Sequence, residues 1–100
     1  MDRITFRSAH VGEIKKLTFD FLSALALGET ISTASVGAAV YSGGTATATL
    51  STPSISGSQV TCTASGDTEG VTFLVTMTIT TSAGQTLALS GFLAMVPAGL

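Results

Sequence analysis

A chain of 100 residues has room for one domain and one hydrophobic core. Its hydrophobic content of 45% excludes a disordered polar chain, and its net charge of −2, with no basic stripe, argues against nucleic-acid binding. Thr and Ser contribute 17 and 12 residues, and this composition favours an all-β fold because branched side chains suit strands while Ser suits turns.

The first third of the chain contains a charged lead-in followed by a strand. Residues 1–12 are expected to form an N-terminal arm or a short strand, and residues 13–97 the domain. Within residues 13–21 the alternation places Leu17, Phe19 and Phe21 on the core face. Residues 22–27 are consistent with either a helical turn or a loop, and Gly28 then ends the segment.

The middle of the chain predicts short strands separated by turns. Residues 30–41 form the second β-rich stretch, with four packing candidates: Ile31, Val36, Val40 and Tyr41. Glycines predict turns at residues 42–44 and 56–58. Residues 59–64 alternate again, with Val60, Cys62 and Ala64 pointing to one side.

The strongest pattern lies near the C-terminus. Apolar side chains occupy alternate positions from Val71 to Ile79, with threonines at most of the positions between, and residues 85–96 continue the alternation after a turn at 82–84. Gly91 in the last strand predicts a bulge or a close backbone approach. Together these elements predict a single immunoglobulin-like β-sandwich of about seven antiparallel strands.

Charged residues are few and unevenly distributed. All four basic residues lie near the N-terminus: Arg3, Arg7, Lys15 and Lys16. After Glu29 the only charged residues are Asp67 and Glu69. Soluble monomers normally scatter charge over their surface, so either part of this neutral surface is covered in an assembly or it is simply coated with Ser and Thr. The basic residues are therefore the candidate partner contacts, and an acidic neighbour would suit them.

Residues suited to chemistry are scarce. His10 is the only histidine, Cys62 is the only cysteine, and Asp67 with Glu69 offers too few oxygen ligands for calcium. No Ser lies in a G-x-S-x-G elbow, and no Gly-rich stretch forms a P-loop. We therefore expect that the protein is not an enzyme and that it binds neither a cofactor nor a metal ion. The N-terminus lacks a signal-peptide pattern, and the most apolar run, residues 87–100, is too short to span a bilayer.

Three segments resemble a family of small phage tail proteins, the fiber–tail adaptor or Ig-like virion proteins. Phe19-Asp20-Phe21 matches an aromatic–acid–aromatic element, residues 28–33 match a G-[DE]-T-I-x-[ST] turn, and residues 76–84 match a closing T-x-x-I-T-T-x-x-G hairpin. The resemblance covers residues 15–96. Family members often carry Trp, which this chain lacks, so Phe19 and Phe21 replace its contact or the contact is absent.

The resemblance implies a virion protein made in the bacterial host cytoplasm and located at the tail or neck. It would link the tail or the head–tail junction to fibers or neighbouring rings, in a ring of six or twelve copies, without contacting nucleic acid or membrane. Two alternatives remain open: a capsid decoration protein, present in hundreds of copies, and a carbohydrate- or cell-surface-binding module. One Tyr and no Trp weigh against the carbohydrate-binding alternative.

Overall fold

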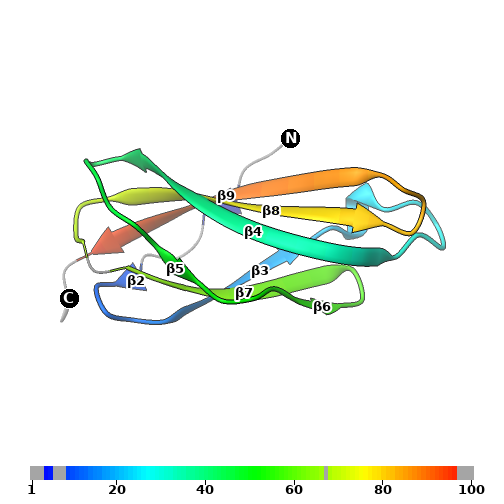
Figure 1. The fold of residues 1–100 in the computed structure, drawn as a ribbon, viewed down its shortest axis with the longest axis horizontal. Coiled ribbons are helices and arrows are strands. Elements are labelled where there is room, and N and C mark those ends of the chain that lie inside the picture. Colours follow the sequence, from blue (N-terminus) through cyan, green and yellow to red (C-terminus); the bar gives the residue numbers. More distant parts are fainter. Residues whose placement is uncertain (1–3, 6–8, 67, 97–100) are drawn as a thin grey trace.

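Two β-sheets pack face to face in the computed structural model, which describes residues 4–5, 9–66 and 68–96. The strands run along the long axis of the molecule, which measures 44 Å (Figure 1). The first sheet contains β4 (Ile31–Ser42), β8 (Thr72–Thr81) and β9 (Thr86–Val96), with β1 (Ile4–Thr5) and β2 (Ala9–His10) beside β9. The second contains β3 (Lys15–Asp20) and β7 (Gln59–Ser65), with β5 (Thr49–Leu50) and β6 (Ser54–Ser56) beside β7.

The strand order is that of an immunoglobulin-like sandwich. The chain changes sheet between β3 and β4, between β4 and β5 and between β7 and β8, which yields the orders β3-β7-β5 and β4-β8-β9. These correspond to the B-E-D and C-F-G strands of that fold. The predicted sandwich is therefore confirmed. The N-terminal strands differ from the expected antiparallel arrangement, because β1 and β2 run parallel to β9.

The core lies between the sheets and contains the alternating apolar side chains that the pattern predicts. It consists of Ala9, Leu17, Phe19, Phe21, Ile31, Val60, Cys62, Ala64, Val71, Phe73, Val75, Met77, Ile79, Leu93 and Met95. Successive side chains of β8 alternate between buried and half-buried, as expected for a strand with one face on the core and the other on the outer surface.

One local prediction is wrong, and another is narrowed to one of its two alternatives. Tyr41 was expected to pack in the core, but its side chain is 58% exposed and meets Phe92 edge to face, with ring centroids 4.6 Å apart. The alternation of β4 directs Val40 toward the core and its neighbour Tyr41 outward. Of the two alternatives for Gly91, the structure contradicts the bulge, because the β8–β9 register is continuous there. The irregularities lie in the β4–β8 pairing, while Gly91 is buried and pairs with Ile4 of β1.

The segment at 22–27 resolves into a short turn and a loop. Leu22–Ala24 form one turn of 3₁₀ helix, and the chain then runs as a loop to Thr30. Among the described residues no helix has the length and hydrophobicity that a membrane span requires.

Candidate interaction surfaces

The two ends of the sandwich differ in chemistry. The end on the right of Figure 1 combines the β3–β4 loop, residues 21–30, with the turns at residues 57–58 and 82–84. The opposite end combines the start of β3 with the loops that follow β4 and β7. We call the first the apolar end, because it exposes Leu22 and Leu27, and the second the basic end, because it contains Lys15 and Lys16, although Glu13 and Glu69 are exposed there as well.

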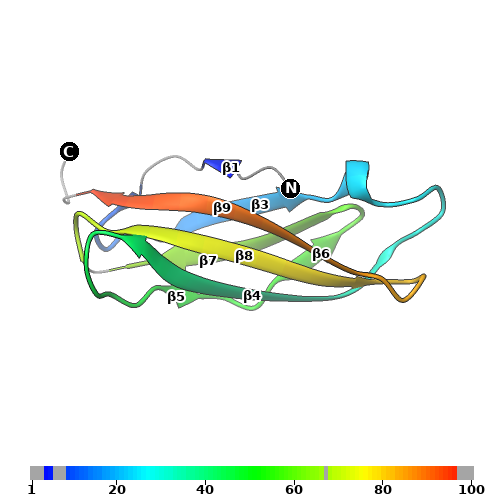
Figure 2. The same cartoon turned by 90° about the horizontal axis from the view of Figure 1, so that it is seen from above.

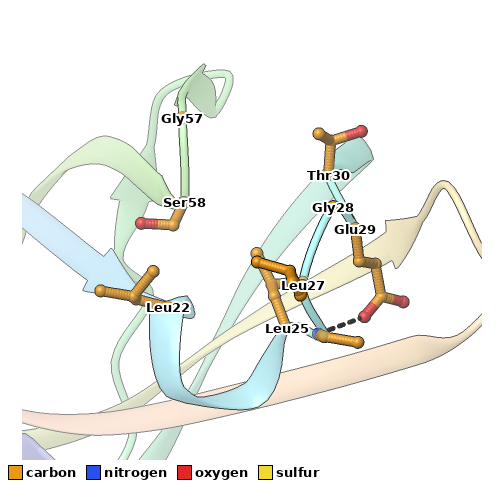
Figure 3. A pocket seen from close by; sticks show the side chains of 9 residues that line it. Leu22, Leu25, Leu27, Gly28, Glu29, Thr30, Gly57 and Ser58 are labelled. Carbon is orange, nitrogen blue, oxygen red and sulfur yellow. Dashed lines mark hydrogen bonds between the residues drawn. The ribbon is translucent and has the colours of Figure 1, made fainter.

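Exposed leucines mark the apolar end. Leu22 is 67% exposed, Leu27 is fully exposed, and Leu25 is half-buried against the core. With Gly57 and Ser58 of the facing turn they line an open hollow of about 390 Å³ (Figure 3). Exposed leucines gathered around a hollow are typical of protein contact sites. The sequence signal was three leucines in six residues between buried Phe21 and Gly28, but sequence reasoning did not identify them as a surface.

Polar contacts hold the first half of this loop in place. The Asp20 carboxylate accepts a hydrogen bond from the Leu22 N–H at 2.9 Å and a longer one from the Ser58 hydroxyl at 3.4 Å. The Phe21 N–H donates to the Ser58 carbonyl at 2.9 Å, and the Phe21 side chain is buried. The acid of the aromatic–acid–aromatic element therefore organises the turn, while its two aromatic residues anchor the turn to the core.

Glu29 fastens the second half of the loop to the end of β8. Its carboxylate accepts hydrogen bonds from the Ala26 N–H at 2.8 Å and from the hydroxyl of buried Thr81 (Figure 3 shows the bond to Ala26). Thr30 and Ser82 are joined twice, through the Thr30 N–H to the Ser82 hydroxyl and the Ser82 N–H to the Thr30 carbonyl. The two hydrogen bonds that Glu29 accepts, chiefly the one from Thr81, hold the pKa of its carboxyl below its ordinary value of 4.5.

The three segments that carry the family resemblance therefore meet at one end of the fold. Residues 19–21 and 28–31 border the loop, and Thr81 and Ser82 of the closing hairpin clamp it. Gly28 makes the turn before Glu29 with φ of +81°, a conformation that other residues seldom adopt. The motifs thus build and position the apolar end.

Lowering the pH is expected to weaken the hydrogen bonds of the Glu29 carboxylate with Thr81 and Ala26. Because the folded pKa of Glu29 lies below its unfolded value, the carboxylate stabilises the fold above about pH 4.5, and this stability is lost as the pH falls through the folded pKa. Thr81→Val removes the main donor, so its deficit in unfolding free energy should be larger at about pH 7 than at about pH 3. Urea denaturation at both pH values measures this difference, with Thr80→Val as the matched control. An equal deficit at both pH values would contradict the assignment.

The structure describes two of the four basic residues that were predicted to contact a partner, Lys15 and Lys16. Lys15 is half-buried and Lys16 is exposed, at successive positions of β3, so their side chains point to opposite faces of the sheet. Arg3 and Arg7 lie outside the described residues. Nearby, the Glu13 carboxylate accepts a hydrogen bond from the His10 N–H at 2.9 Å, which lowers the pKa of Glu13.

The described residues contain no group of three or more His, Cys, Asp or Glu side chains placed to hold a metal ion. Cys62 is buried, and desolvation raises the pKa of its thiol, as expected for a small core residue rather than a nucleophile. Asp67, one of the two late acidic residues, lies outside the described residues.

Comparison with protein families identifies one match. Residues 10–94 match the family described as Podophage GP4 fiber-tail adaptor protein gp77. Searches of curated proteins and of solved structures returned no match. A fiber–tail adaptor is a structural component of the phage tail that binds other virion proteins, and it is not a class of enzyme. The chain belongs to this fiber–tail adaptor family and is a structural protein of the phage tail.

Proposed function

We propose that this protein is an adaptor at the tail or neck that links the tail or the head–tail junction to fibers or neighbouring rings. The observation that carries the proposal is the family match over residues 10–94. The chain would be made in the host cytoplasm and assembled into a ring of six or twelve copies. It would act through protein–protein contacts alone, with residues 13–97 as the sandwich domain and residues 1–12 as an N-terminal arm or short strand.

The shape of the sandwich supports a bridging role. A bridge must present two separate surfaces, and the apolar and basic ends lie at opposite ends of a molecule 44 Å long and 21 Å wide. The apolar end, with Leu22 and Leu27, suits a neighbour that buries hydrophobic surface. Lys15 and Lys16 lie toward the other end, and we propose that they contact an acidic neighbour together with Arg3 and Arg7, because these four residues are the only basic residues of the chain and all lie within its first sixteen positions.

Neutralising the basic residues should reduce incorporation into particles. Deleting residues 1–12 is a poor test, because Ala9 is fully buried and its loss would damage the core. In phage complemented with the triple variant Arg3→Gln, Arg7→Gln, Lys16→Gln, we expect the copy number per particle to fall by about threefold or more, since charge steers and orients association. Quantitative mass spectrometry of purified particles provides the count.

The control variant is Arg3→Lys with Arg7→Lys, which keeps the charge and should be incorporated normally. Normal incorporation of the triple variant would contradict the basic contact. Hundreds of wild-type copies per particle would contradict the adaptor role and indicate a capsid decoration protein instead.

A further inference from the structure

Sandwich edges need protection, because an unpaired strand edge is a template for another chain. Among the described residues the two sheets have four outer edges, and three of them carry recognised protection. The β1 and β2 edge consists of two-residue strands. The β5 and β6 edge is short and is interrupted by Pro53. The β3 edge carries three charged residues: Lys15, Lys16 and Asp20.

The fourth edge, β4, has none of these protections. It is 12 residues long and contains neither a charged residue nor a proline. Within the described residues it pairs with β8 alone. The two irregularities in that pairing lie near its ends, so the register is continuous from Thr33 to Val40. A long, regular and uncharged edge of this kind is what strand addition requires.

The surroundings of β4 are also neutral and incompletely covered. β4 lies beside β5 and β6 of the other sheet (Figure 2), and no charged residue occurs between Glu29 and Asp67, so all three strands are uncharged. On the core-facing side of β4, Val36 and Val40 are only half-buried and Ala38 is exposed. β5 and β6 are short and separated, and they leave this apolar face partly open.

We propose that β4 pairs with β4 of a second copy of this chain, in antiparallel orientation about a twofold axis. An uncharged strand can pair with itself in any register without like-charge repulsion, whereas a β3 self-pair would suffer it in a register that sets Lys15 opposite Lys16. The side chains at the centre of β4 are small, because Gly37 lies between Val36 and Ala38. A Cβ built on Gly37 meets no atom within 4 Å, so there is open space beside this residue. An axis at Gly37 would place Val36 opposite Ala38 and Ala34 opposite Val40, which extends the apolar face across the pair.

This inference rests on the strand topology and not on the adaptor role, so the two can fail separately. Twofold pairing nevertheless agrees with the proposed copy number, since six such dimers make twelve copies. The adaptor role is tested by copy number in particles, whereas the strand pairing is tested on the purified chain.

Sedimentation of the full chain tests the pairing. We expect wild-type protein to form dimers at roughly 100 µM. The double variant Ser35→Lys, Ala39→Lys adds charge at two exposed positions of β4 and should raise the dimer dissociation constant by about tenfold or more. The matched control, Thr18→Lys with Ser23→Lys, adds the same charge at exposed positions away from β4 and should leave dimerisation unchanged.

Hydrogen exchange provides a second measurement that does not depend on a variant. Amides of β4 should gain protection as the wild-type concentration rises, while those of β3 should not. A wild-type chain that is monomeric at this concentration would overturn the proposal. The proposal would also be overturned by a dimer that persists in the Ser35→Lys, Ala39→Lys variant and shows no added protection of the β4 amides. A dimer that dissociates in a Leu27→Ser variant, but not in the lysine variant, would overturn it as well.

Discussion

Replacing Phe73 by Ala is expected to remove about 3–5 kcal/mol of unfolding free energy. The Phe73 side chain is 2% exposed and lies in β8, opposite Val40 of β4 and Leu93 of β9. Truncation loses the transfer free energy of the ring and leaves a cavity that paired strands on both sides cannot collapse to fill. A domain of this size has only about 5–15 kcal/mol in total, so the variant would be close to unfolding.

Tyr41→Ala is the matched control for the core variant. Tyr41 is an aromatic residue at a neighbouring place in the sheet, but its side chain is 58% exposed, so its loss forfeits little beyond the edge-to-face contact with Phe92, about 0.5–1.5 kcal/mol. Urea denaturation of both variants measures the difference. Equal costs for the two would show that the outer face of the sheet is as tightly packed as the core.

The turn after β4 should be almost as sensitive as the core. Gly43 has φ of +101°, and a Cβ there would lie 2.1 Å from the carbonyl oxygen of Gly70. Gly43→Ala would therefore combine strained backbone, about 1–3 kcal/mol, with overpacking against a main chain that must move, about 1–3 kcal/mol more. We expect a total loss of about 2–6 kcal/mol in the free energy of unfolding.

The adjacent Gly44 separates these two effects. Its φ of +121° is also unfavourable for Ala, but no atom lies within 4 Å of a Cβ built there. Gly44→Ala should show the backbone strain alone, and the difference between the two variants in urea denaturation measures the close approach of the loops. If Gly44→Ala is as costly as Gly43→Ala, the contact with Gly70 does not limit substitution.

The hydrogen bonds at the apolar end explain physically why the family motifs contain the residue types they do. Gly28 makes the turn, Glu29 binds the loop and Thr81, Thr30 pairs with Ser82, and Ile31 is buried below them. These contacts leave Leu22 and Leu27 on the surface of an ordered loop rather than a loose one. A neighbour that docks there would therefore meet a preorganised surface, which lowers the entropic cost of binding.

The sequence by itself determined the fold class, the core faces and the hairpin of β8 and β9. Period-two alternation is a local property, so the burial of Phe73, Val75 and Met77 follows from the pattern of β8 alone. The family also followed from short motifs, because each motif records a local requirement: a left-handed glycine, a capping acid or a buried aromatic residue.

Only the tertiary structure decided which strands form the edges, how the N-terminal strands pair and where the motifs meet. Those features depend on contacts between residues far apart in the chain, such as Glu29 with Thr81, and alternation carries no information about them. The outward direction of Tyr41 became clear only when the pairing of β4 with β8 placed Val40 on the core side. The unprotected edge of β4 likewise exists because the fold pairs β4 on one side only.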